Sequence, residues 1–417
     1  MLRVALVCDL AEENWTSMNL VGDMLFEHLE QFHRDTIRAN RIQPAFKRRV
    51  TAFGSFRPSR FAWKCDLLWN RRVEYSRWLR RRSHDYDIFH ILDQSYAHLA
   101  LSLPRDRTVI TCHDLDVFRC LLEPTREPRP LWFRTMTQGT LKGLQSAQHV
   151  IFVSESIRRE AEGLALSSNP GSSVIHNGAQ YDSVPGQDEA NDLLGSERGE
   201  LLLLSVGSTV PRKRMDVLLR VFAGVVKEFP GARLVRVGGP LSETQLDLAR
   251  HLNVIQSIVE LPFVNRTALN AVYERGALLL QTSEAEGFGL PVAEAMARGC
   301  PVVASDLPVL REVGGHAATY CTDGDISGWI ETVTRLLRQR CSDPIFWSHL
   351  RSRSIENASR FSWRENAEKT VSVYQRVIAS STGNSHCSSS SRAMTSKVDE
   401  VSSHCDQARA VDLCPAK

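Results

Sequence analysis

Short runs of apolar residues alternate along this chain with longer segments of helical periodicity. Most of the apolar runs are continuous, which is typical of strands that are covered on both faces of a parallel sheet. In the first half they are residues 3–8, 88–91, 108–112, 149–153 and 173–176. In the second half they are residues 201–206, 233–237, 258–261, 277–281, 301–304 and 319–321. Helical segments between the runs, such as 215–228 and 291–298, are the crossovers that βαβ units need.

The two series of runs predict an α/β protein of two domains. Residues 181–199 are rich in Asp, Gly, Ser, Glu and Pro, which indicates a linker. We therefore expect a Rossmann-like, doubly wound domain over residues 1–180 and a second one over residues 200–361. Ligands of such sheets bind at the carboxyl ends of the strands, so two facing sheets predict one deep site in the cleft between them.

The pattern changes after residue 361. Ser362 and Glu365 have the spacing of a capping box, which predicts that a helix begins there. This helix, residues 362–379, carries its apolar and partly apolar positions at 367, 371, 374 and 378. Residues 380–417 are Ser-rich with few large apolar side chains, so we expect this tail to be disordered.

Composition and residue spacing mainly exclude a secretion signal, a membrane span and a zinc site. The chain has 42% apolar and 24% charged residues, and 51 Lys and Arg nearly balance 48 Asp and Glu. Asp9 interrupts the first apolar run, which favours a buried strand over a secretion signal. No run reaches the roughly 18 apolar residues of a membrane span. The cysteines form no C-x-x-C pair, which disfavours zinc binding. We expect a cytoplasmic protein with reduced thiols.

The strongest chemical signal is the segment from Glu286 to Glu294, which follows the expected strand at 277–281. Gly287 and Gly289 let the backbone approach a ligand, and Pro291 suits the first turn of a helix. The free N–H groups of such a helix start favour an anion by about 0.3–1 kcal/mol. The two carboxylates can then hold hydroxyl groups of the same ligand. A turn followed by a solvated helix is the alternative interpretation.

A second signal follows the strand at 201–206. After Gly207 the chain carries Arg212 and Lys213, and adjacent cations at the carboxyl end of a strand are suited to bind phosphate. A solvated basic turn is the alternative.

A third signal is His113-Asp114-Leu-Asp116 after the strand at 108–112. His113 would face the cleft and hydrogen-bond a hydroxyl group or tune a leaving group. Asp114 and Asp116 also resemble the Asp-x-Asp of metal-dependent transferases. We expect no metal, because Lys213, Arg212 and helix N–H groups can neutralise a diphosphate instead.

Together these motifs resemble the retaining glycosyltransferases of the GT-B fold, group 1 (family 4). The resemblance is strongest over about residues 207–320. Weaker markers are 87–98, His113-Asp114, 153–155, 176–178 and 361–363, so that most of residues 1–379 is covered. It implies transfer of a hexose-type sugar from a nucleotide-diphosphate donor with retention, as in polysaccharide biosynthesis. It also implies that the helix at 362–379 packs back on the first domain.

The resemblance assigns roles to individual residues. Glu286 would contact the sugar that is transferred, and Glu294 would contact the ribose of the nucleotide. Lys213 would bind the diphosphate, and His113 would lie near the donor sugar. The remaining donor-side positions are backbone N–H groups, offered by Gly287, Phe288, Gly289 and Leu290.

Two positions depart from the family pattern. The arginine that the family places shortly after the strand glycine is Ser208 here, and we expect Arg212 to replace it at the donor phosphates. The Gly-Gly loop after the first strand is also missing. This loop, residues 12–18, usually faces the acceptor, so we assign Asn14, Trp15 and Asp114 to the acceptor side.

Residues 34–82 combine many Lys and Arg with Phe61, Trp63, Trp69, Tyr75 and Trp78. One interpretation is a surface that docks peripherally on anionic lipid at the inner membrane surface. A second is a groove for an acidic or lipid-linked acceptor, and a third is a helix that packs its aromatics on its own domain. No nucleic-acid recognition motif accompanies the charge.

The expected function is therefore a metal-independent, retaining glycosyltransferase without a cofactor, acting on a glycan, lipid-linked or small-molecule acceptor. A nucleotide-sugar epimerase of the same fold is one alternative. An inactive homologue that serves as a binding subunit is another. The motifs do not specify the sugar, the base, the acceptor or the oligomeric state.

Overall fold

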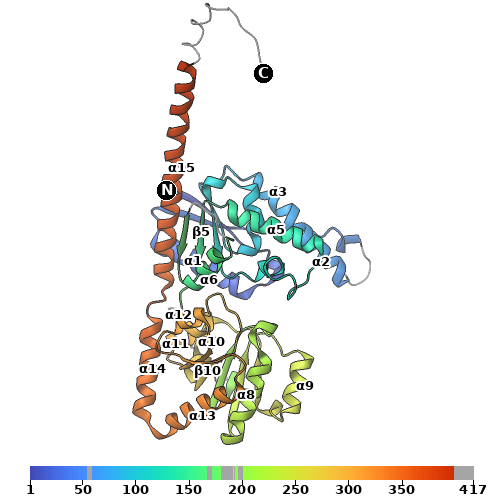
Figure 1. Cartoon of the computed structure of the whole chain (residues 1–417), viewed down its shortest axis with the longest axis vertical. Helices are drawn as coiled ribbons and strands as arrows, with labels where there is room; N and C mark the ends of the chain where they lie inside the picture. The colour runs from blue at the N-terminus through green and yellow to red at the C-terminus, as the bar shows by residue number, and fades with distance from the viewer. Residues whose placement is uncertain (54–58, 167–170, 180–190, 192, 196–200, 399–417) are drawn as a thin grey trace, which may run out of the picture.

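A computed structural model describes residues 1–53, 59–166, 171–179, 191, 193–195 and 201–398, with residues 382–398 described by their backbone alone. Figure 1 shows two lobes, with the long helix α15 (Trp363–Val398) running alongside the N-terminal lobe and extending beyond it. Most of the linker expected at 181–199, and the tail from 399, lie outside the described residues.

The N-terminal lobe is a parallel sheet with the strand order β2-β1-β3-β4-β5-β6. Its strands are β1 (Leu2–Val7), β2 (Ile37–Ile42), β3 (Ile88–Ile91), β4 (Thr108–Cys112), β5 (His149–Phe152) and β6 (Gly171–Val174). Its helices are α1 (Thr16–Phe32), α2 (Arg60–Trp69), the π-helix η3 (Asn70–Glu74), α3 (Tyr75–Arg80), α4 (Arg119–Leu122), α5 (Leu131–Ser146) and α6 (Glu155–Gly163). Single turns are η1 (Ala11–Glu13), η2 (Thr51–Phe53), η5 (Arg105–Arg107) and η6 (Asp116–Phe118), and η4 (Gln94–Ser102) is longer.

The C-terminal lobe repeats this plan with the order β12-β11-β10-β7-β8-β9. Its strands are β7 (Leu201–Val206), β8 (Ala232–Val237), β9 (Ile258–Leu261), β10 (Leu278–Gln281), β11 (Val302–Ser305) and β12 (Thr319–Cys321). Its helices are α8 (Met215–Glu228), α9 (Glu243–His251), α10 (Arg266–Arg275), α11 (Leu290–Ala297), α12 (Pro308–Gly314), α13 (Ile326–Ser342) and α14 (Pro344–Ala358), with single turns η7 (Pro211–Lys213) and η8 (Ile255–Ser257).

Both sheets are buried on both faces, which explains the continuous apolar runs. In β1, Ala5 and Val7 belong to the core on one face, and Val4 and Leu6 to the core on the other. Successive side chains of a strand point to opposite faces, so a strand needs apolar residues at every position when helices cover both sides. The expected class, two doubly wound α/β units facing across a cleft, is confirmed.

One strand of the described chain was not expected. β2 has the burial pattern of an edge strand, with Arg38 and Arg41 alternating with buried positions. This strand has no continuous apolar run, because an edge strand exposes part of its length. In the sequence its residues therefore look like part of the basic stretch 34–82.

The final helix, α15 (Trp363–Val398), begins where the capping box predicts, and the N–H of Glu365 donates to the Ser362 hydroxyl. Its apolar face packs against the N-terminal lobe through Val371, Tyr374 and neighbouring residues. The helix continues past residue 379, so residues 380–398 are helical where disorder was expected. Extending a formed helix adds one hydrogen bond for each residue ordered, which favours propagation from a packed segment. None of the described helices is long and apolar enough to cross a membrane.

Candidate active site

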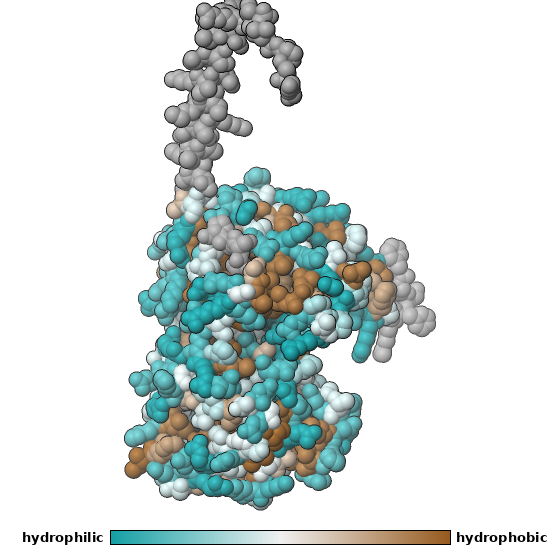
Figure 2. Space-filling view, in the orientation of Figure 1, coloured by the Kyte–Doolittle hydropathy of each residue, from teal (hydrophilic) through white to brown (hydrophobic). Residues whose placement is uncertain are grey.

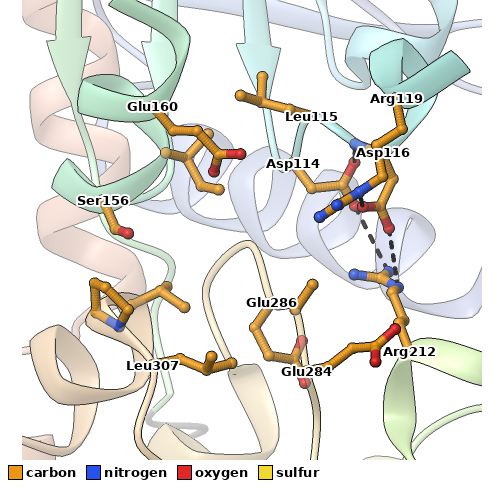
Figure 3. A pocket seen from close by; sticks show the side chains of 14 residues that line it. Asp114, Leu115, Asp116, Arg119, Ser156, Glu160, Arg212, Glu284, Glu286 and Leu307 are labelled. Carbon is orange, nitrogen blue, oxygen red and sulfur yellow. Dashed lines mark hydrogen bonds and ion pairs between the residues drawn. The ribbon is translucent and has the colours of Figure 1, made fainter. Parts of the chain in front are cut away.

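A cavity of about 220 Å³ lies between the two lobes. Its walls come from the segment after β4, from α6, from the turn η7 and from the loops that precede α11 and α12. Figure 3 shows Asp114 and Asp116 on the N-terminal side, opposite Arg212 and Glu286 on the C-terminal side. The carboxyl ends of β4, β7 and β10 thus meet at this cavity, as expected for facing doubly wound sheets.

Glu286 is the most constrained carboxylate of the cavity. Its Oε1 lies 2.5 Å from Lys213 Nζ and accepts hydrogen bonds from the Ser283 hydroxyl at 2.7 Å and from the Gln281 amide. Its side chain is 6% exposed. Burial alone would raise the pKa of Glu286, but the charge of Lys213 and the hydrogen bonds outweigh it and lower this pKa. The carboxylate is therefore ionised at neutral pH, and within the described residues its Oε2 has no hydrogen-bond partner.

Arg212 crosses the cleft. Its Nε lies 3.0 Å from Asp116 Oδ2 and its Nη2 lies 3.6 Å from Asp114 Oδ2. Burial, and then the charge of Asp116, raise the pKa of Asp114 to about 6, although Arg212 opposes this. The guanidinium thus lies between the two carboxylates of the Asp-x-Asp segment, where a cation is favoured. In the described chain no group of three or more His, Cys, Asp or Glu side chains has metal-binding geometry.

The loop before α11 is docked on the N-terminal lobe. The hydroxyl of Ser154 donates to the Gly287 carbonyl at 2.9 Å. A Cβ atom at Gly287 would lie 1.8 Å from the carbonyl oxygen of His113, so only glycine fits this approach. Gly287 therefore serves a contact between lobes in addition to the ligand contact that the sequence suggests.

His113 is buried behind this contact. Its backbone N–H donates to Gln94 Oε1, and its Nε2 lies 2.8 Å from the carbonyl oxygen of Leu92. Because a carbonyl only accepts, Nε2 carries the proton and Nδ1 is the acceptor. Burial lowers the pKa of His113, which keeps the ring neutral.

The start of α11 offers backbone donors. Gly289 has a φ of +90°, which lets the chain turn into the helix. Within the described residues the N–H groups of Phe288, Gly289 and Leu290 make no hydrogen bond. The Phe288 ring packs against His176 and Phe361, which holds this segment in place. An anion at this position would gain these donors.

Glu294 lies one turn farther along α11 and is buried, and its Oε2 accepts a hydrogen bond from the Tyr273 hydroxyl at 2.9 Å. Other candidates lie outside the cavity. Ser208 is exposed beyond β7, and Asn14 and Trp15 are exposed at the junction of η1 and α1. The structure thus brings Glu286, Lys213, Arg212 and Asp114 together at the cavity. Ser208, Asn14 and Trp15 lie outside it.

Sequence reasoning missed Arg236, which is buried at the end of β8. Its Nη2 donates to the carbonyls of Gly207 and Gly239 at 3.0 and 3.1 Å, so that it joins the turns after β7 and β8. Only glycine fits at position 238 in this turn, because a Cβ there would lie 2.3 Å from the Gly207 carbonyl oxygen. The signal that could have found it was an arginine inside an apolar strand run.

The basic aromatic stretch is divided between two roles. Tyr75 is fully buried in the core of the N-terminal lobe, and Trp78 packs against that core. Phe61 is 76% exposed and Trp63 is 38% exposed on α2. Figure 2 shows apolar residues among the hydrophilic surface of this lobe. The interpretation as a helix packed on its own domain therefore holds for α3 but not for α2.

Comparisons with known proteins agree with this architecture. The family described as Glycosyl transferases group 1 matches residues 187–361, and Glycosyltransferase Family 4 matches residues 24–182. The D-inositol 3-phosphate glycosyltransferase of Mycolicibacterium smegmatis is 32% identical over 218 residues, which are 49% of this chain and 48% of that protein. The alignment thus spans about half the length of this relative.

Solved structures share the fold. Sucrose-phosphate synthase from Thermosynechococcus elongatus has a TM-score of 0.69 at 16% identity, covering 91% of this chain and all (100%) of that one. Anabaena HepE in complex with UDP and glucose has a TM-score of 0.65 at 17% identity, covering 90% of this chain and 100% of its own. These structural likenesses show the GT-B fold. The family matches, which together span both lobes, show that the chain belongs to the group 1, family 4 glycosyltransferases.

Proposed function

We propose that this protein transfers a hexose-type sugar from a nucleotide-diphosphate donor to an acceptor, with retention at the anomeric carbon and without a metal. The observation that carries the proposal is the buried Glu286–Lys213 pair beside the free N–H groups at the start of α11. A fixed carboxylate for sugar hydroxyls next to fixed positive groups for a diphosphate is what such a donor requires.

The proposed mechanism is electrostatic. The diphosphate gains negative charge as the glycosidic bond breaks, and Lys213, Arg212 and the α11 N–H groups stabilise that charge. Glu286 holds the transferring sugar and Glu294 the ribose. His113 is neutral, with Nδ1 as an acceptor for a donor hydroxyl. The acceptor hydroxyl attacks the face that the diphosphate leaves, and the leaving phosphate oxygen takes its proton.

UDP is the first nucleotide to test, because the HepE structure contains UDP and glucose in the same fold. Thermal unfolding with UDP, GDP, ADP and their common sugars tests the donor site. A ligand at about 100 times its Kd stabilises a protein by about 2.7 kcal/mol. We expect one nucleotide to raise Tm in the wild type, and Glu294→Gln and Lys213→Ala to diminish this shift. Lys227→Ala, on the far end of α8, is the matched control.

Two alternatives give other results. An epimerase would convert the nucleotide sugar without an acceptor, so product analysis by NMR separates it from a transferase. An inactive binding subunit would show no turnover, and it is the alternative that Ser208 favours, because this position lacks the family's arginine. Failure of all nucleotides to shift Tm would refute the donor site.

Location and membrane contact are part of the same proposal. The exposed Phe61 and Trp63 on α2 stand beside Arg60 and Lys64, which suits peripheral docking of a cytoplasmic enzyme on anionic lipid. Equal flotation with neutral and anionic liposomes would refute the lipid preference.

A further inference from the structure

The carboxylate of Glu312 joins the two lobes beside the cavity. It belongs to α12 of the C-terminal lobe, and its oxygens accept hydrogen bonds from the backbone N–H groups of Glu155 at 2.8 Å and Ser156 at 3.0 Å. These two residues begin α6 of the N-terminal lobe. The first N–H groups of a helix have no partner within the helix, so the glutamate supplies acceptors that α6 itself lacks. Figure 3 shows Ser156 and Leu307, the residue before α12, in the wall of the cavity.

His176 is a further partner of this carboxylate. Its Nε2 lies 2.8 Å from Glu312 Oε1, and it comes from the segment after β6 of the N-terminal lobe. The glutamate side chain is 18% exposed. Burial alone would raise the pKa of Glu312, but the hydrogen bonds from His176 and from the two N–H groups of α6 outweigh it and lower this pKa. Glu312 is therefore an anion at neutral pH, placed at the positive end of α6.

Ser154 connects the same turn of α6 to a second part of the C-terminal lobe. Its hydroxyl accepts from the N–H of Ile157 at 3.2 Å, which caps α6, and donates to the carbonyl of Gly287 at 2.9 Å. Gly287 belongs to the loop that carries Glu286. The first turn of α6 is thus attached both to the loop before α11 and to α12.

His176 also links Glu312 to the start of α11. Its ring packs against Phe288 with a centroid separation of 5.9 Å and against Phe361 at 5.6 Å, and the two phenylalanine rings meet edge to face. The N–H of Phe288 is one of the groups that we propose bind the diphosphate. A shift of the His176 ring would therefore move a proposed donor group, although Glu312 itself lies outside the cavity.

We propose that Glu312 is a positioning residue for sugar transfer: it holds the first turn of α6 against the C-terminal lobe and, through His176, fixes Phe288 at the donor. The inference rests on the proposed transferase activity, which is the reaction that this positioning serves. A carboxylate suits the role because its two oxygens accept from two neighbouring N–H groups and from the imidazole at once. An amide has a single acceptor oxygen, so it would turn its own N–H groups toward one of these donors.

Amide hydrogen exchange of the full chain tests the contact directly. An N–H at the start of a helix exchanges quickly unless another group holds it. We expect the amides of Glu155 and Ser156 to be protected in the wild type and to exchange at least about tenfold faster in Glu312→Ala. The amide of Ile157, which Ser154 caps within the N-terminal lobe, is the internal reference and should keep its rate. Glu312→Gln should keep one of the two amides protected and release the other.

Kinetics separate positioning from a merely structural role. With UDP-glucose as the probe, Glu312→Gln should lower kcat for release of UDP by about tenfold. The Kd for UDP should change by less than about threefold, because a displaced N–H at Phe288 matters most as charge develops on the leaving diphosphate. His176→Phe keeps an aromatic ring against Phe288 but lacks the N–H for the carboxylate, so its loss of kcat should be smaller. Glu331→Gln, at an exposed position on α13 of the same lobe, is the matched control and should behave as the wild type does.

The results separate this inference from the proposed function. Equal exchange of the Glu155 and Ser156 amides in the wild type and in Glu312→Ala would overturn the inference and leave the donor site standing. Faster exchange with unchanged kcat in both Glu312 variants would make the contact structural only, which also overturns the positioning role. Protection that depends on Glu312, in a protein that neither binds UDP nor releases it from UDP-glucose, would support the contact between the lobes and count against the proposed donor.

Discussion

Lys213 Nζ lies 2.5 Å from Glu286 Oε1, although the two residues are 73 positions apart. The lysine comes from the turn after β7 and the glutamate from the loop after β10, and these strands are neighbours in the sheet. The pair is almost closed to solvent, so the lysine fixes the carboxylate as an anion beside the groups that we propose bind phosphate.

Glu286→Gln should lower kcat for release of UDP from UDP-glucose by about 100-fold or more, because the fixed negative charge at the transferring sugar is lost. The Kd for UDP should change by less than about threefold, since the nucleotide contacts remain. Steady-state kinetics and calorimetry measure both. Glu356→Gln, at an exposed position on α14 outside the cavity, is the control. Full turnover in Glu286→Gln would show that the assigned role is wrong.

Asp116→Asn and Arg212→Gln should change UDP affinity in opposite directions. Arg212 is held 3.0 Å from Asp116 and must loosen this contact to bind a diphosphate. Asp116→Asn should therefore tighten UDP binding by about threefold to tenfold, and Arg212→Gln should weaken it by about tenfold. Titration calorimetry at low salt measures both. Weaker binding in both variants would mean that the aspartate helps to hold the nucleotide.

Gly287→Ala should destabilise the contact between the lobes. The new Cβ would lie 1.8 Å from the His113 carbonyl oxygen, so the loop must move away from the N-terminal lobe. Such overpacking costs about 1–3 kcal/mol, and displacement of Glu286 should lower turnover with it. Denaturant unfolding and UDP release measure the two effects. The control is Gly231→Ala, where a Cβ meets nothing within 4 Å. Unchanged stability would argue against a closed arrangement in solution.

Asp114→Asn should make the protein more stable at pH 7–8 and leave stability unchanged near pH 4. Burial, with the charge of Asp116, raises the pKa of Asp114 from 3.8 to about 6. A carboxyl group with a raised pKa stabilises the fold fully below its ordinary pKa, and this contribution is lost as pH rises through about 6. The gain should be at most about 3 kcal/mol at pH 7, because a shift of about two pKa units corresponds to about 1.4 kcal/mol per unit.

The pH dependence of Tm checks this expectation, with the exposed Asp106→Asn as the control. A loss of stability at pH 7 in Asp114→Asn would mean that the ion pair with Arg212 outweighs burial.

Strands covered on both faces were predictable, because a short continuous apolar run bounded by turn residues is typical of such strands. β3, β4, β7 and β9 have the bounds that the sequence predicts. β2 was missed because an edge strand can keep Arg38 and Arg41 at the surface. Helix α15 extends beyond the predicted end at residue 379, because a helix that is already formed can grow from its packed segment without an apolar face.

The sequence by itself determined the two doubly wound units, the Glu286–Glu294 segment and the basic turn at Arg212 and Lys213, because periodicity and local backbone chemistry are encoded over a few residues. Only the tertiary structure decided that Arg212 pairs with Asp116, that Gly287 abuts His113, and that β1 and β3 end side by side. These contacts join residues far apart in the chain. They depend on strand register and on how two lobes pack, which no local pattern specifies.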